Sequence, residues 1–146
     1  MMTFGLVSLF GLTSFDDIRT KQVRVLEIII FAVFGIILNI YYRTNSLTSI
    51  MGGLMIGGVI YLFSIVSKEK IGKGDALIIM VSGLYLGFFD TLILLWLASV
   101  FAAVFGGIYM LAHKNKGDIE LPFVPFLLLG YMTMFSVETI LEIIAL

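Results

Sequence analysis

One short stretch, Gly72-Lys73-Gly74-Asp75, opens the apolar run Ala76–Phe89 and decides how the rest of the chain is interpreted. A carboxylate at the start of a membrane helix is partly withdrawn from water, so ionising it costs free energy. The glycines on both sides of Lys73 allow a tight backbone turn and a close approach by another group. The pattern indicates a functional carboxylate at a membrane border, and the rest of the sequence can be understood as placing a second carboxylate beside it.

The composition is typical of an integral membrane protein. Of the 146 residues, 60% are hydrophobic and 13% are charged, whereas soluble domains contain about 45–50% apolar and about 25% charged residues. The net charge of −1 gives no reason to expect a nucleic-acid partner. The chain has no cysteine and a single histidine, His113. Thiolate and histidine-based metal sites and the Ser/His/Asp arrangement are therefore poorly supported, and no cofactor is expected.

Six apolar segments predict an all-α, polytopic membrane protein with six transmembrane helices in one compact bundle. The connections are short and no Pro/Ser-rich linker divides the chain, so residues 1–146 are expected to form a single membrane-embedded domain without a separate soluble domain. The chain is apolar from Met1 without a basic preface, which favours a first membrane helix over a removed signal peptide. The segments are Met2–Phe15, Val25–Tyr42, Leu47–Val66, Ala76–Phe89, Thr91–Ala112 and Phe123–Ile144.

The basic residues predict the orientation in the membrane, because cytoplasmic loops carry an excess of Lys and Arg. Eight of the nine fall in the first, third and fifth connections, one (Arg43) falls in the second, and the turn predicted near Asp90 has none. With six spans, the odd-numbered loops face the cytoplasm and both termini lie outside. The eight residues are Arg19, Lys21, Arg24, Lys68, Lys70, Lys73, Lys114 and Lys116.

Glycines predict where helices approach closely, since a missing side chain lets two backbones make contact. They form a stripe on the third segment, repeat with a four-residue spacing on the fourth, and occur as a pair in the fifth. Packing alone is the simplest explanation of these residues. They are Gly52, Gly53, Gly57, Gly58, Gly83, Gly87, Gly106 and Gly107.

Two carboxylates are expected to meet at the cytoplasmic border. Asp16 and Asp17 close the first predicted helix, and Asp75 opens the fourth. The first helix runs inward and the fourth outward, so these ends can lie at one depth. Two acids held close together share a proton and titrate as a pair. One can take a proton from water while the other donates one to a carbonyl oxygen, which is aspartic-protease chemistry. The alternative is a pair of solvated helix ends with Arg19 and Lys21 as surface partners.

Three motifs resemble those of the type IV prepilin peptidases, a family that includes the archaeal preflagellin peptidases. The stretch Gly72–Asp75 resembles the GxGD signature of membrane aspartic peptidases. The segment Asp17–Val23 (DIRTKQV) resembles the family's first aspartate segment, and Leu121–Gly130 (LPFVPFLLLG) resembles the Pro-Phe-x-Pro-Phe segment that opens the last helix. GxGD alone is a weak signal, but three motifs in the right order across nearly the whole chain are specific.

The resemblance implies an aspartic endopeptidase of the cytoplasmic membrane that needs no cofactor. Such enzymes cut a short basic leader from prepilin-like or preflagellin-like proteins at the cytoplasmic membrane border, after a glycine and before the hydrophobic helix of the substrate. The implied partners are these substrates and the lipid bilayer. The catalytic pair would be Asp17 and Asp75, because Asp17 and not Asp16 precedes the Ile-Arg of the motif. Which of the two is the base stays open.

Further residues near the two motifs are expected to bind the substrate or shape the site. The alternatives are a rigid helix entry for the prolines and solvated loop charges for the acidic residues. The residues are Gly72, Lys73, Gly74, Glu120, Pro122, Phe123 and Pro125.

The chain departs from the resembling family in two places. Arg24-Val25 stand where the family commonly has Pro-Asn. The cytoplasmic insert with paired cysteines, which long bacterial members carry and which is associated with N-methylation, has no counterpart here. We therefore expect peptidase activity without a recognisable methyltransferase module, and methylation itself stays open.

Three other functions fit the same acidic residues less well. A small transporter or channel subunit could use the border aspartates as a proton relay, although such sites usually lie near mid-membrane. A catalytically silent assembly protein could bind partners through its glycine faces. Another GxGD peptidase class, the presenilin-like enzymes, cuts within the membrane helix of its substrate, but the Leu121–Gly130 prolines and the small size favour the prepilin type.

Overall fold

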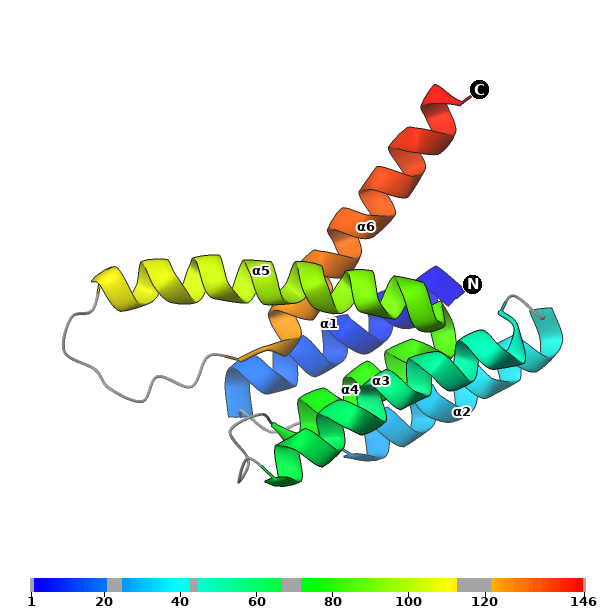
Figure 1. Ribbon diagram of the computed structural model, residues 1–146, viewed down its shortest axis with the longest axis horizontal. Coiled ribbons are helices and arrows are strands. Elements are labelled where there is room, and N and C mark those ends of the chain that lie inside the picture. Colours follow the sequence, from blue (N-terminus) through cyan, green and yellow to red (C-terminus); the bar gives the residue numbers. More distant parts are fainter. Residues whose placement is uncertain (1, 21–24, 43–44, 67–71, 113–121, 146) are drawn as a thin grey trace.

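Every secondary-structure element in the described part of the chain is a helix. The computed structural model describes residues 2–20, 25–42, 45–66, 72–112 and 122–145 (Figure 1). Each of the six predicted segments corresponds to one helix, which confirms the all-α prediction. The helices are α1 (Met2–Thr20), α2 (Val25–Tyr42), α3 (Leu47–Val66), α4 (Lys73–Leu86), α5 (Phe88–Ala112) and α6 (Val124–Ile144).

Four of these helices, α2, α3, α5 and α6, are long and apolar enough to cross a membrane. The other two do not meet this criterion, so the prediction of six spans is not confirmed. α4 has 14 residues, about 21 Å at 1.5 Å per residue, which is shorter than the roughly 30 Å hydrocarbon core of a bilayer. α1 has 19 residues but carries buried polar side chains, among them Thr13, Ser14 and Asp17.

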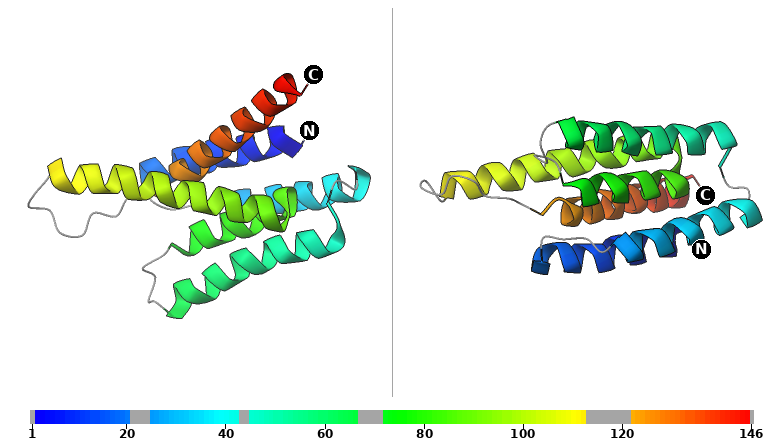
Figure 2. Two further views of the ribbon diagram at one scale, coloured as in Figure 1. Left: turned by 45° about the horizontal axis from the view of Figure 1, so that its top comes forward. Right: turned by 90° about the horizontal axis from the view of Figure 1, so that it is seen from below.

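α4 is the central helix of the bundle, in contact with α1, α2, α3 and α5. A helix that is apolar all round is stable when other elements cover it. α5 extends beyond the neighbouring helices, and the C-terminal half of α6 leaves the bundle at an angle (Figures 1 and 2). From Phe135 onward every α6 residue is exposed, so the predicted compact bundle excludes this part. Buried residues of α4 are Ala76, Ile78, Ile79, Val81, Ser82, Gly83, Leu84 and Tyr85.

The predicted close approach of glycines is confirmed between α3 and α4. A Cβ atom on Gly53 would lie 2.6 Å from the Gly83 carbonyl oxygen, and one on Gly57 would overlap the backbone of Met80. The two helices therefore touch backbone to backbone, and any side chain would force them apart. The prediction is wrong for Gly107, because a Cβ there would meet no atom within 4 Å.

The junction between α4 and α5 lies at Gly87, earlier than the turn predicted near Asp90. Gly87 has a φ of 79°, which costs glycine little and other residues much. Its N–H donates to the Gly83 carbonyl oxygen at 2.9 Å and ends α4. The N–H of Phe88 then donates to Ser49 Oγ at 3.1 Å. Asp90 consequently lies within the first turn of α5 and not in a connection.

Two asparagines fix the C-terminal end of α4. The last carbonyl groups of a helix have no partner within it. Asn39 Nδ2 of α2 donates to the Leu84 carbonyl oxygen at 2.5 Å, and Asn45 Nδ2 donates to the Tyr85 carbonyl oxygen at 2.8 Å. These bonds hold α4 along its axis and thereby set the position of its opposite end, where Asp75 lies.

Candidate active site

The first aspartate lies on the buried face of α1. The helix does not end with the apolar run at Phe15 but continues to Thr20, so Asp17 is held by regular backbone. The spacing of Leu6, Phe10, Thr13 and Asp17 places these residues on one stripe of the helix, and all four are buried. Asp17 is only 7% exposed. Asp17 therefore lies on the same face of α1 as the core residues, and its carboxylate is directed into the bundle.

The carboxylate of Asp17 meets the beginning of α6. Its Oδ2 accepts a hydrogen bond from the backbone N–H of Val124, with an N–O distance of 3.2 Å. Val124 is the first residue of α6 and is fully buried. The N–H groups of a first helical turn have no acceptor within the helix, so Asp17 supplies one from the other end of the chain.

The second aspartate lies in the first turn of α4. The helix begins at Lys73, and Asp75 is partly buried. Gly72 precedes the helix, and its carbonyl oxygen accepts from the Ala76 N–H at 3.3 Å. A Cβ on Gly72 would lie 3.0 Å from Asp75 Oδ2. The first glycine of the motif therefore leaves space that the Asp75 carboxylate needs.

The two carboxylates influence each other's ionisation. Burial raises the pKa of Asp75 to about 7, and the negative charge of Asp17 contributes to the increase. Burial also raises the pKa of Asp17, while the hydrogen bond from Val124 acts in the opposite direction. The charge of Asp17 thus acts on Asp75, the aspartate with which the sequence predicts it to pair. Such a pair can hold one proton near neutral pH, with one member ionised and the other protonated.

The predicted site-shaping residues that the structure describes stand next to Asp75 or next to Val124 along the chain. Lys73 and Gly74 are the first two residues of α4. Phe123 is the N-cap of α6, and Pro125 is its second residue, so both flank the Val124 N–H that binds Asp17. Pro122 stands directly before them and is half-buried. Glu120 lies outside the described residues.

Sequence reasoning missed two groups near Asp17. The Val124 N–H carries no side-chain signal, because it belongs to the backbone. Ser14 is 5% exposed, and its Oγ has no hydrogen-bond partner in the part of the chain that the structure describes. It lies three residues before Asp17, a spacing at which helical side chains are neighbours. The Ser-x-x-Asp spacing in the sequence could therefore have indicated that Ser14 lies beside Asp17. The described residues contain no group of three or more His, Cys, Asp or Glu side chains that could hold a metal ion.

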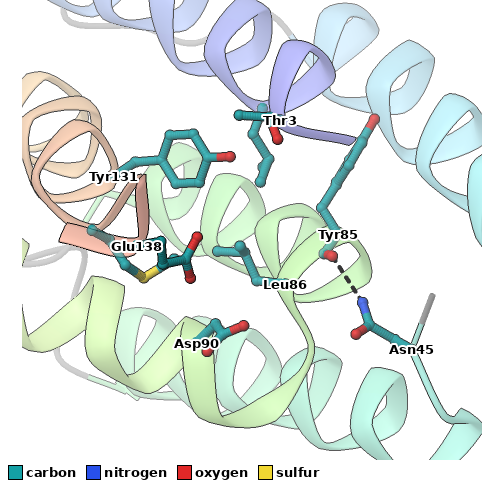
Figure 3. Close-up of a pocket in the computed structure, with 9 residues that line it drawn as sticks. Thr3, Asn45, Tyr85, Leu86, Asp90, Tyr131 and Glu138 are labelled. Atoms are coloured by element: carbon teal, nitrogen blue, oxygen red, sulfur yellow. Dashed lines mark hydrogen bonds between the residues drawn. The ribbon is translucent and has the colours of Figure 1, made fainter. Parts of the chain in front are cut away.

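A separate polar cavity lies toward the other end of α1. It has a volume of about 180 Å³, and Thr3, Tyr85, Asp90, Tyr131 and Glu138 are among the residues that line it (Figure 3). Thr3 precedes Asp17 by 14 residues of one helix, which corresponds to about 21 Å. The acidic residues of this cavity are therefore remote from the aspartate pair.

Comparison with known proteins identifies one matching family. The model of the type IV leader peptidase family matches residues 4–107, more than two thirds of the chain. The match includes Asp17 and the stretch Gly72–Asp75 and ends before the segment Leu121–Gly130. No curated protein and no solved structure matches the chain.

Proposed function

The chain belongs to the type IV leader peptidase family, and from this premise we propose that it is a membrane aspartic endopeptidase whose catalytic residues are Asp17 and Asp75. The substrates would be type IV prepilin-like or preflagellin-like proteins, from which it removes the basic leader. The observation that carries the proposal is the electrostatic influence of the Asp17 carboxylate on the Asp75 carboxylate. They come from helices that are distant in sequence, and the charge of Asp17 acts on the ionisation of Asp75.

The chemistry follows from a pair that holds one proton. The ionised carboxylate takes a proton from a water molecule, and the resulting hydroxide adds to the carbonyl carbon of the scissile peptide bond. The protonated carboxyl gives its proton to the carbonyl oxygen, which forms a neutral tetrahedral diol. The carboxyl that took the proton from water then gives it to the amide nitrogen, and the other carboxylate takes a proton from a diol hydroxyl as the C–N bond breaks, which restores the pair. The products are a leader with a new carboxyl group and a mature protein with a new amine.

We place the pair at the cytoplasmic border of the cell membrane. α1 and α4 run alongside the four candidate spans (Figure 2), which supports a bundle with all six helices in the bilayer. The eight-to-one excess of basic residues in alternate connections supports cytoplasmic loops at the end where Asp17 and Asp75 lie, with both termini outside. In this arrangement the substrate's apolar helix stays in lipid while its leader reaches the site from the cytoplasm.

The test is cleavage of a prepilin-like peptide by the purified protein in detergent, followed by mass spectrometry of the products. Asp17→Asn and Asp75→Asn are expected to abolish cleavage. Asp16→Asn is the matched control, since it changes the neighbouring carboxyl on the same helix, and it is expected to retain activity. A fully active Asp75→Asn protein would refute the proposal. Proton flux in proteoliposomes without any cleavage would favour a transporter instead.

A further inference from the structure

We propose that the backbone N–H of Val124, in the first turn of α6, assigns the roles of the two aspartates. It keeps Asp17 ionised as the general base, so that Asp75 stays protonated as the general acid. This inference rests on the proposed peptidase function and assigns the roles within it. It also assigns a role to the Pro-Phe-x-Pro-Phe segment, whose presence the peptidase chemistry alone does not explain.

The opening turn of α6 leaves one backbone donor for Asp17. Pro125, the second residue of the helix, has no N–H. The N–H of Phe126 donates to the Phe123 carbonyl oxygen at 3.0 Å. Of these three residues, Val124 therefore has the backbone N–H that can donate to another helix, and it donates to Asp17 Oδ2. The proline spacing thus selects the residue between the two Pro-Phe pairs as the donor, whatever its side chain.

The contact favours the ionised form of Asp17 for two reasons. A carboxylate accepts an N–H bond more strongly than a neutral carboxyl does, so the bond stabilises the charge. The N-terminus of a helix also carries a partial positive charge. Since Val124 is fully buried, water does not compete for its N–H. With Oδ2 held, Oδ1 is the oxygen of Asp17 that can take a proton from water.

The surroundings of Asp75 favour its protonated form. No side chain caps the N-terminus of α4, and within the described residues no hydrogen bond to the Asp75 carboxylate is present. The start of α4 does favour a negative charge, but burial and the charge of Asp17 outweigh it and raise the pKa of Asp75 to about 7. A buried acid beside an ionised neighbour keeps its proton, and this proton is available for the substrate carbonyl.

Several other titratable groups belong to the helix ends on the Asp75 side of the bundle. α4 is packed against α1, α2, α3 and α5, yet Asp17 is the charged group that raises the pKa of Asp75. The groups at this end in the described part of the chain are Asp16, Asp17 and Arg19 of α1, Glu27 of α2, Tyr61 of α3, Lys73 of α4 and Tyr109 of α5.

The decisive experiment replaces the Val124 amide by an ester, which removes the N–H and keeps the side chain. The acid limb of the pH dependence of kcat reports the base in the substrate complex. We expect the Val124 ester to move this limb upward by about one pH unit. The matched control is an ester at Phe126, which removes an N–H from the same turn that does not bind Asp17, and it is expected to leave the limb in place.

The outcomes separate this inference from the peptidase function. If the wild type cleaves and the Val124 ester has the wild-type profile, or both esters move the limb equally, the role of α6 is refuted while the peptidase stands. If the wild type does not cleave, the proposed function itself fails. Should the Val124 ester not fold, infrared spectra of the wild type and of Asp75→Asn at a pH between 3.8 and about 7 decide the matter. The wild-type spectrum should contain a protonated carboxyl band that is missing from the spectrum of Asp75→Asn, and equal bands in the two proteins would overturn the assignment.

Discussion

Asp17 of α1 accepts a hydrogen bond from the backbone N–H of Val124 in α6, and this single contact joins the first and last helices at the candidate active site. The bond is buried, so it is not exchanged for one with water. α1 packs directly against α6 elsewhere along its length as well. The position of one candidate catalytic carboxylate therefore depends on the packing of the two ends of the chain.

Replacing Asp75 by Asn should stabilise the protein at alkaline pH. Because the pKa of Asp75 is raised from 3.8 to about 7, its contribution to stability is fully present below 3.8 and is lost as the pH rises through about 7. The difference between these two pKa values limits the gain in the free energy of unfolding to about 4 kcal/mol. Because Asp75 is partly exposed, we expect a gain of about 2 kcal/mol.

Thermal unfolding in detergent at about pH 8 and at about pH 4 measures this effect. The Asn variant should unfold at a higher temperature than the wild type at the alkaline pH, with the difference shrinking at the acid pH. Asp16→Asn serves as the control for removal of a nearby carboxyl. A variant that is less stable than the wild type at the alkaline pH would show that Asp75 is not held in a site that disfavours its charge.

Replacing Asp17 by Asn should lower the pKa of Asp75. The negative charge of Asp17 is the second cause of the raised value, after burial, so its removal leaves the burial contribution alone. Titration of ¹³C-labelled aspartate carboxyls by NMR measures the change, with the Asp75 signal assigned by its loss in Asp75→Asn. An unchanged Asp75 titration in Asp17→Asn would mean that the two carboxyls are not electrostatically coupled.

Replacing Gly83 by Ala should destabilise the contact between α3 and α4. The added Cβ would overlap the backbone of Gly53, and overpacking of this kind typically costs about 1–3 kcal/mol. Gly107→Ala is the matched control, because a Cβ there meets open space and alanine favours a helix by about 1 kcal/mol over glycine. Unfolding in detergent should separate the two variants, and equal stability would contradict the backbone contact.

Much of the fold follows from local sequence, because apolar runs and turn residues determine helices directly. The predicted bounds of α2 and α3 match the structure. The α4–α5 junction was misplaced because Phe88 and Phe89 look like a continuation of the preceding run, whereas the positive φ of Gly87 and the Ser49 hydroxyl depend on tertiary packing. Four of the six predicted spans are long and apolar enough to cross a membrane. The predicted spans at α1 and α4 are not confirmed, and α4, with 14 residues, is buried among its neighbours.

The sequence was sufficient to propose the two carboxylate side chains of the candidate site, but not its backbone donor. Asp17 and Asp75 stand at the ends of predicted helices that run in opposite directions, so the sequence predicts that they lie at one depth, and the glycine pair marks Asp75. The Val124 donor could not be foreseen, because every residue except proline carries a backbone N–H. Ser14 was overlooked for another reason: a serine in an apolar helix usually bonds to its own backbone, as Thr13 does with the Leu9 carbonyl oxygen.

The central claim is that Asp17 and Asp75 act as one catalytic unit, and a double-mutant comparison of kcat/KM for peptide cleavage tests it most directly. We expect Asp17→Asn and Asp75→Asn each to lower kcat/KM by at least about a hundredfold, and the double variant to be no slower than the slower single variant. Losses that multiply in the double variant, or a single variant with wild-type activity, would contradict the claim.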